Sequence, residues 1–401
     1  MALIDQGTDH QTIFGRCRAQ LGVLCRGVLG EARADEAVAQ LDKLVPALGD
    51  RPVSAPPLWS GMCDDASPYE LSVAMRSGGS SEVGRRNQAA DVRLLLEAHR
   101  SPASPQAYWR ASQRLTHVLC QVAGVDWAGV RQIEDLFVPR VQQPFFVCQH
   151  GLEFRADRRA LGKIYLNPAA SGRDPWEVVG QAAERLGVVE ACRRLRRELP
   201  ASARVTLISV DLSRGSAPRF KVYVRRWHAT PDELTDAYMR GEHAREQDIP
   251  AFTRLLTGSE GSLARRPVFM TYHLTKTNAL PSRVVLSLPM FPYCAHDGVA
   301  RDRILRLLDH FAIDPKPYLT AHRAVCGVGV VQGPSTVGSH SYVSFQREAT
   351  GARVTTYFCP LLYAPRHGLL ALDPQKNFWA DPTGEAGPIP TPHGVSTHTG
   401  E

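Results

Sequence analysis

Five blocks of similar organisation follow one another along the chain, and each has two segments with helical periodicity followed by two with strand periodicity. Anchor positions in the successive second strands lie 70, 58, 64 and 68 residues apart, at Arg93, Lys163, Lys221, Val285 and Arg353. Because sequence identity between the blocks is weak, the pattern indicates divergent repeats. Five successive strand pairs predict ten antiparallel strands.

The elements of each block are recognised by hydrophobic spacing and by capping signals. Ser104, Asp174 and Thr230 each precede a proline, which is typical of a helix start. The predicted helices lie at 10–49, with a break near Gly30, then at 105–124, 127–137, 174–187, 188–199, 230–238, 252–256 and 301–311, and a short one follows. The predicted strands lie at 67–75, 90–98, 143–154, 161–168, 203–213, 216–226, 266–275, 282–290, 339–348 and 352–360.

Helices must cover the apolar face of such a sheet, and helix pairs on one side would leave its polar face uncovered. A sheet of ten strands tends to curl, and closure removes its exposed edges. The sequence therefore predicts an α+β fold: a ten-stranded antiparallel barrel, apolar face outward beneath a ring of α-helices, around a polar, solvent-filled lumen. We expect one domain over residues 1–380 and a disordered tail over 381–401.

The stretch Ser216–Arg226 illustrates what this lumen would contain. In an extended strand Arg219, Lys221 and Tyr223 share one face, and three apolar residues share the other. Alone, this alternation is more typical of a solvated outer face. Its recurrence in other strands favours a shared lumen, whose further predicted members are Glu70, Ser72, Arg93, Lys163, Tyr165, Arg353, Thr355 and Tyr357.

These residue types indicate a particular chemistry. Arg and Lys side chains that converge in a partly dry cavity are costly unless an anion compensates them, so the cluster predicts a phosphate-like ligand. Tyrosines can donate hydrogen bonds to phosphate and stabilise a cation over their rings. With one well-placed carboxylate, Glu70, the set suits an allylic diphosphate that ionises to a carbocation.

Composition and charge argue against several other classes of protein. The net charge of +7 arises from 47 basic and 40 acidic residues, without a dense Lys/Arg block. The nine cysteines show no CxxC pair or metal-ligand spacing and are expected to be reduced thiols. No signal peptide is recognised, and no apolar run approaches the roughly 18 residues of a membrane span. We expect a cytoplasmic monomer or weak homodimer that binds neither nucleic acid nor membrane.

Three motifs give the chain a family resemblance: DDASPYELS with DVRLLLEA, GKIYLNPAASG, and PRFKVYV. Over about Asp64 to Pro360 the chain resembles the aromatic prenyltransferases of the dimethylallyltryptophan synthase type, in their bacterial branch. The resemblance implies the prenyltransferase (ABBA) barrel. It also implies that dimethylallyl diphosphate or a longer homologue reacts with an indole acceptor.

The resemblance further implies roles for individual residues. The diphosphate-binding and cation-shielding positions are matched by Arg93, Lys163, Tyr165, Arg219, Lys221 and Tyr223. Arg353 joins the diphosphate-binding set through its place on the lumen face, and Tyr357 is similar to a shielding tyrosine of the last strand. Glu70 matches the glutamate that receives the indole N–H. Apart from the resemblance, Met62, eight residues before Glu70, is expected to contact the acceptor through its backbone.

Two departures from the family pattern concern the lumen. Val285 and Ser287 stand where the family often has Gln and Tyr, which predicts a roomier prenyl pocket and a thinner shield. The lysine that serves as proton acceptor in fungal relatives has no counterpart around His150 to Glu153, so the terminal base is unassigned.

No metal or cofactor is expected. The chain lacks a DDxxD cluster, and the Asp64–Asp65 pair is typical of a turn before the first strand. His150, His273, His340 and His367 show no ligand spacing. Fixed cations can replace magnesium, so activity without added metal is predicted.

The leading hypothesis is prenylation of the indole ring of tryptophan or a tryptophan-derived small molecule. One alternative keeps the chemistry but changes the acceptor to a phenol or tyrosine, with O-prenylation. The other is a non-catalytic basic barrel that binds an anionic metabolite or nucleic acid, with an affinity that falls steeply with salt.

Overall fold

The computed structural model describes residues 12–78, 90–142, 144–156, 160–212, 219–276, 281–291, 293–327 and 338–363. The predicted tail at 381–401 and His367 lie outside these ranges.

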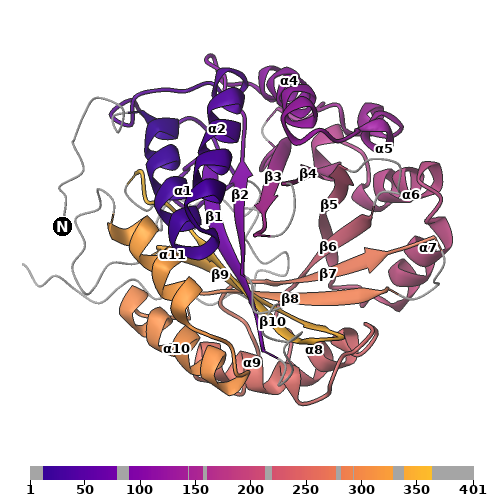
Figure 1. Cartoon of the computed structure of the whole chain (residues 1–401). Coiled ribbons are helices and arrows are strands. Elements are labelled where there is room, and N and C mark those ends of the chain that lie inside the picture. The colour runs from indigo at the N-terminus through magenta and orange to yellow at the C-terminus, as the bar shows by residue number, and fades with distance from the viewer. Residues whose placement is uncertain are drawn as a thin grey trace, which may run out of the picture.

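Ten antiparallel strands close into one barrel, in which each strand pairs with its neighbours in the sequence and β1 pairs with β10 (Figure 1). This confirms the predicted closure. The strands are β1 (Tyr69–Arg76), β2 (Asp91–Leu96), β3 (Cys148–Phe154), β4 (Leu161–Leu166), β5 (Arg204–Leu212), β6 (Phe220–Arg226), β7 (Val268–Leu274), β8 (Arg283–Pro289), β9 (His340–Glu348) and β10 (Gly351–Phe358).

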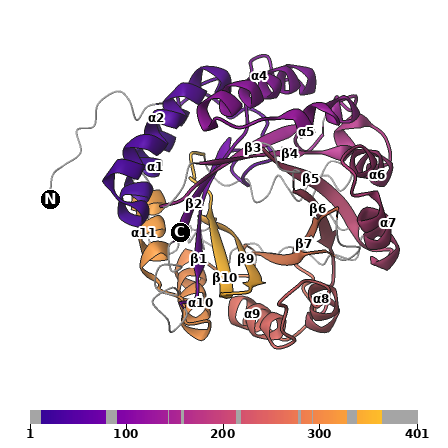
Figure 2. The same ribbon diagram turned by 45° about the vertical axis from the view of Figure 1, so that its right-hand side comes forward.

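Helices precede each strand pair and surround the barrel (Figure 2). They are α1 (Ile13–Leu29), α2 (Glu31–Leu48), α4 (Pro105–Ala123), α5 (Ala128–Arg131), α6 (Pro175–Arg185), α7 (Val189–Glu198), α8 (Pro231–Tyr238), α9 (Asp248–Thr257), α10 (Asp297–His310) and α11 (Lys316–Gly327), with 3-10 turns η2 (Glu134–Phe137) and η3 (Pro168–Ser171). The ring closes where α1 packs against α11.

The capping signals begin helices where the sequence predicts them. The side chains of Ser104, Asp174 and Thr230 accept hydrogen bonds from backbone N–H groups of the first turn, and Thr230 forms a full capping box with Glu233. The single helix predicted over 127–137 is wrong, because α5 ends at Arg131 and the chain continues as the separate turn η2.

The hydrophobic core lies between the outer face of the barrel and the helices. Leu71 and Val73 of β1 and Val222 of β6 are fully buried there, on the face opposite Glu70 and Lys221. Phe345 of β9 packs against Phe252 of α9 with ring centroids 5.6 Å apart. Each such side chain contributes about 1.5–3 kcal/mol on burial, so the outward apolar face holds the helical ring in place.

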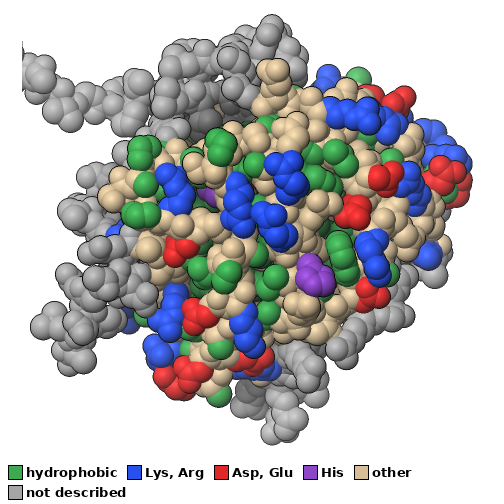
Figure 3. All heavy atoms as spheres, turned by 90° about the horizontal axis from the view of Figure 1, so that it is seen from above, with side chains coloured by type: hydrophobic (Ala, Val, Ile, Leu, Met, Phe, Trp, Pro, Cys, Tyr) green, Lys and Arg blue, Asp and Glu red, His purple; other side chains and the backbone are tan. Residues whose placement is uncertain are grey.

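The surface and the thiols agree with the sequence analysis. Basic and acidic side chains are interspersed on the face seen in Figure 3. All nine cysteines are free thiols. Among the described residues, none of the helices has the length and the hydropathy that crossing a bilayer requires.

Candidate active site

The lumen holds two adjoining cavities of different character. A polar cavity of about 90 Å³ lies toward one end, and a cavity of about 160 Å³ with mainly apolar walls adjoins it. Tyr165, Tyr223, Ser287 and Tyr357 line both. All twelve site residues predicted from the sequence line one or both of these cavities.

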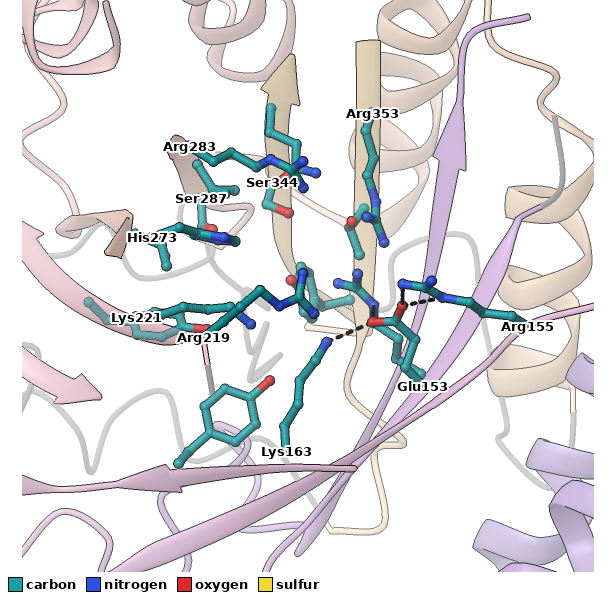
Figure 4. Close-up of a pocket in the computed structure, with 18 residues that line it drawn as sticks. Glu153, Arg155, Lys163, Arg219, Lys221, His273, Arg283, Ser287, Ser344 and Arg353 are labelled. Carbon is teal, nitrogen blue, oxygen red and sulfur yellow. Dashed lines mark hydrogen bonds and ion pairs between the residues drawn. The ribbon is translucent and has the colours of Figure 1, made fainter. Parts of the chain in front are cut away.

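Seven cationic side chains from six strands and their flanking residues line the polar cavity (Figure 4). Five of them are predicted, and Arg155 and Arg283 are additional. The set is Arg93, Arg155, Lys163, Arg219, Lys221, Arg283 and Arg353. Such a convergence of N–H donors from opposite walls is suited to an anion with several oxygen atoms.

Carboxylates already pair with these cations, which corrects the expectation that Glu70 is the one carboxylate of the lumen. Glu153 of β3 pairs with Lys163 at 2.6 Å and Arg93 at 3.1 Å and also contacts Arg155. Asp211 of β5 lies 2.9 Å from Lys221. Although burial opposes ionisation, Arg93 and Lys163 hold the pKa of Glu153 well below its usual range.

The pairing leaves a positive excess. Asp91 and Glu348 each pair with Arg353, at 2.9 and 3.2 Å, and complete the carboxylate set. Among the described residues, four carboxylates pair with these seven cations and with Arg76, so positive groups outnumber negative groups in the network. The negatively charged oxygen atoms of an allylic diphosphate would compensate this positive excess.

Two lining groups have their protonation changed by burial. Burial lowers the pKa of Lys163 to about 7, although Glu153 acts in the opposite direction. Burial also holds the pKa of His273 well below its usual range, and cations such as Lys221, its partner across β6 and β7, act the same way. His273 is therefore a neutral donor or acceptor beside the cations.

Arg219 differs from the other predicted cations in its position. It precedes β6, and its side chain is 48% exposed, whereas Lys221 is only 6% exposed. Arg219 pairs with Asp211 and still lines the cavity. The described part of this stretch, from Arg219 on, therefore presents Lys221 and Tyr223 inside the barrel and Arg219 at its rim. The predicted strand residues 216–218 lie outside the described ranges.

The tyrosines form the boundary between the two cavities. The rings of Tyr165 on β4 and Tyr223 on β6 meet edge to face with centroids 6.1 Å apart, and the Tyr223 hydroxyl lies 3.4 Å from that of Ser209. Tyr357 of β10 lines both cavities. Because aromatic faces carry negative potential, rings at this boundary can stabilise a carbocation formed there.

The two residues that depart from the family pattern lie on the lumen side of β8. Val285 lines the polar cavity, and Ser287 lines both cavities opposite Phe269 of β7. Their small side chains leave space that Gln and Tyr would fill.

The apolar cavity has aromatic walls and one ionisable carboxylate, Glu70, among its described lining residues. Phe145 and Phe146, before β3, line the cavity together with Met62 and Gly61 of the segment before β1, and Gly61 packs against Phe145. A Cβ at Gly61 would stand 2.5 Å from the carbonyl oxygen of Phe145, so a larger residue would displace this wall. The cavity suits a planar apolar group with one polar N–H.

The environment of Glu70 raises its pKa. Burial raises the pKa to about 7, against the effect of a 2.5 Å hydrogen bond that the Ser341 hydroxyl donates to Oε1. Lys and Arg side chains do not line this cavity in the described part of the chain. A carboxylate in such surroundings gains strongly from an N–H donor, and it can also take up a proton near neutral pH.

Sequence reasoning missed several residues that line the cavities or pair with their cations. Glu153 and Asp211 alternate with apolar neighbours on their strands and face the cations, so strand alternation could have found both. His273 and Arg283 give the same signal on β7 and β8. The remaining missed residues of the apolar cavity carry no comparable pattern: Gly61, Leu95, Phe145, Phe146, Gln149, Leu207, Phe269 and Tyr342.

Three possible metal ligands converge outside the linings of the two cavities. Within the described ranges, Cys63, Asp65 and Cys359 have ligand atoms within 4.8 Å of one another. The Asp65 carboxylate accepts hydrogen bonds from Ser67, which are typical of the predicted turn. Asp64 instead forms a two-point ion pair with Arg266 at 2.6 and 2.7 Å.

Comparison with known proteins decides the family. The model of the tryptophan dimethylallyltransferase family matches residues 38–315. The chain belongs to this family. It is therefore a prenyltransferase, and its barrel is the prenyltransferase barrel that the sequence predicts.

Solved structures of related enzymes superpose on most of the chain. A 6-dimethylallyltryptophan synthase from Micromonospora olivasterospora, in complex with DMASPP and Trp, is 27% identical with a TM-score of 0.78, over 88% of this chain and 98% of that chain. PriB, in complex with product diphosphate, is 28% identical with a TM-score of 0.77 over the same shares. A 5-dimethylallyltryptophan synthase from Streptomyces coelicolor, with DMASPP and Trp, is 25% identical with a TM-score of 0.77, over 89% and 97%.

Proposed function

We propose that the enzyme transfers a dimethylallyl or longer prenyl group from an allylic diphosphate to the indole ring of tryptophan or a tryptophan-derived small molecule. The observation that carries the proposal is the shared tyrosine boundary between a cationic cavity and a cavity containing Glu70. The solved complexes of the Micromonospora and Streptomyces enzymes with DMASPP and Trp support this pair of substrates.

In the first step the allylic C–O bond breaks, and its electrons stay with the diphosphate. The fixed cations of the polar cavity, among them Arg93 and Lys221, stabilise the charge that develops on the leaving group. Because their ion pairs hold them in place before the substrate arrives, little reorganisation is needed. These cations take the role that magnesium has in other diphosphate enzymes, so we propose that the reaction requires no metal.

In the second step the indole ring attacks the allyl cation across the tyrosine boundary and a C–C bond forms. The attacked ring carbon then loses its proton, for which the released diphosphate is an available acceptor, and the ring regains its aromaticity. Tyr165, Tyr223 and Tyr357 shield the cation from water, and the closed barrel limits quenching. Glu70 accepts a hydrogen bond from the indole N–H, which raises the electron density of the ring and orients it toward the cation. Met62 and the aromatic walls hold the acceptor in the apolar cavity.

Incubation of the protein with dimethylallyl diphosphate and either L-tryptophan or L-tyrosine, followed by mass spectrometry, tests the proposal. A prenylated tryptophan with release of diphosphate is expected, and NMR of the product gives the position and orientation of the prenyl group. Prenylation of tyrosine alone would favour the phenolic acceptor. The absence of product from any indole would contradict the proposal.

A further inference from the structure

A β-bulge in β9 brings two consecutive side chains into the lumen beside Glu70. On β10, Thr356 pairs with Val343, and Phe358 pairs with His340. Ser341 and Tyr342 therefore stand together opposite the single residue Tyr357, which is the arrangement of a bulge.

The bulge decides which way Ser341 faces. After it, Val343 and Phe345 lie in the outer core, while Ser344 and Gln346 line the polar cavity. Regular alternation would place Ser341 on the outer face with Val343. Instead, Tyr342 lines the apolar cavity and the Ser341 hydroxyl donates to Glu70 Oε1.

Contacts outside the barrel fix the chain at the bulge. The carboxylate of Asp297, the first residue of α10, accepts hydrogen bonds from the backbone N–H groups of Ser339 and His340, both at 3.1 Å. It also accepts from Nδ1 of His340 at 2.8 Å, and Nε2 of the same ring accepts from the Tyr318 hydroxyl of α11 at 2.9 Å. Ser339, His340, Tyr318 and Asp297 are all buried.

We propose that Ser341 is a positioning residue for Glu70, and that the bulge held by Asp297, His340 and Tyr318 sets its hydroxyl against Oε1. The inference rests on the proposed role of Glu70. With Oε1 held by Ser341, Oε2 is presented to an N–H donor in the apolar cavity. Ser341 need not touch the acceptor to act in this way.

The surroundings of Glu70 make this hydroxyl important for its ionisation. Asp64, Cys63 and Tyr342 interact electrostatically with Glu70, and Asp64 is itself paired with Arg266. Burial and Asp64 both favour the protonated acid, whereas the hydrogen bond from Ser341 favours the carboxylate. Loss of the hydroxyl therefore raises the pKa of Glu70, and a protonated Glu70 is a poorer acceptor for the N–H.

The test compares Ser341→Ala and Ser341→Thr in the full-length enzyme. For Ser341→Ala we expect kcat/KM for the acceptor to fall about tenfold, with the acid limb of its pH profile displaced about one unit upward. KM for the prenyl diphosphate should stay unchanged, and Ser341→Thr should restore both acceptor values. Ser262→Ala, which removes a surface hydrogen bond to the His228 carbonyl, is the matched control.

Three results would overturn the inference. The first is a Ser341→Ala variant whose pH profile keeps the acid limb of the wild type. The second is a Ser341→Thr variant whose kcat/KM for the acceptor is as low as that of Ser341→Ala, because packing would then explain the loss. The third concerns the contacts outside the barrel. Asp297→Asn should displace the acid limb in the same direction as Ser341→Ala, but by a smaller amount. An unchanged acid limb would overturn the proposed role of Asp297 in holding the bulge.

Glu70→Gln separates the two proposals. If Glu70→Gln turns over like the wild type, the proposed function of Glu70 fails. If Glu70→Gln is impaired while Ser341→Ala keeps wild-type kcat/KM and pH profile, only the inference about Ser341 fails.

Discussion

The two ends of the lumen solve the problem of burying charge in different ways. Around the polar cavity each of the four paired carboxylates lies within 3.2 Å of a lining cation, so the charges largely compensate one another and leave a positive excess. Of the four, Glu153 also lines the cavity. In the apolar cavity Glu70 has a hydroxyl as its hydrogen-bond partner. Burial therefore raises the pKa of Glu70 to about 7.

The comparison teaches that one barrel can prepare two substrates by opposite means. Ion pairs hold the cations rigid at one end, which suits a highly charged leaving group. At the other end a hydrogen-bond donor would stabilise the carboxylate in its apolar surroundings, which suits a neutral ring with an N–H. The tyrosines separate these environments, and the reacting atoms of the proposed substrates would meet there.

The largest effect is expected when the apolar end loses its carboxylate. Glu70→Gln should reduce turnover by about a thousandfold, because the amide cannot polarise the indole N–H as a carboxylate does. Binding of the prenyl diphosphate, measured by calorimetry, should stay within about twofold of the wild type. A parallel loss of diphosphate binding would show that the two ends are not independent.

The removal of one cation from the polar cavity should impair both diphosphate binding and turnover. Arg93→Leu should lower kcat by about a hundredfold and weaken diphosphate binding, because it removes stabilisation of the leaving group and leaves Glu153 with fewer partners. Arg193→Leu is the control, since this arginine of α7 is 60% exposed and distant from the lumen lining. Equal effects of the two variants on steady-state kinetics would argue against a specific role for Arg93.

A change of pH should affect the two substrates in opposite directions. As pH falls through about 7, Glu70 takes up a proton, and kcat/KM for the acceptor should fall about tenfold per unit. As pH rises through about 7, Lys163 loses its proton, and kcat/KM for the diphosphate should fall similarly. Bound diphosphate stabilises the charged amine, so saturation should remove the alkaline limb.

Substitutions by side chains that do not titrate near pH 7 test the assignment of the two limbs to Glu70 and Lys163. Glu70→Gln should lack the acid limb in its residual activity, and Lys163→Arg should lack the alkaline limb. A limb that persists in the corresponding variant belongs to another group.

A smaller effect is expected at the boundary between the cavities. Ser287→Tyr should reduce turnover of a ten-carbon diphosphate about tenfold relative to dimethylallyl diphosphate, because the larger side chain fills space beside the prenyl group. Competition between the two diphosphates measures the ratio. An unchanged ratio would place the prenyl chain elsewhere.

The smallest effect is expected from removal of metal. Treatment with a chelator should change the initial rate by less than about twofold, since fixed cations compensate the diphosphate. Recovery of a large lost activity by magnesium would contradict a metal-independent reaction.

Much of the fold could be predicted because it depends on local patterns. The caps at Ser104 and Thr230 begin helices, and alternation on β4 and β6 sends Lys163 and Tyr223 to the lumen. The prediction of one helix over 127–137 was wrong because helical spacing does not reveal the break after Arg131. The site was predicted largely through cations and tyrosines, and its internal carboxylates Glu153 and Asp211 were missed although their strands show the same alternation.

The sequence by itself determined which face of each strand is apolar, and therefore that the sheet closes around a polar lumen beneath helices. That pattern is local, with a period of two residues along each strand. Only the tertiary structure decided which buried groups meet. Glu153 is paired because the register sets it opposite Arg93, and Ser341 reaches Glu70 because a bulge reverses the alternation that would turn it outward. Pairing across strands depends on register and bulges, which residue periodicity does not specify.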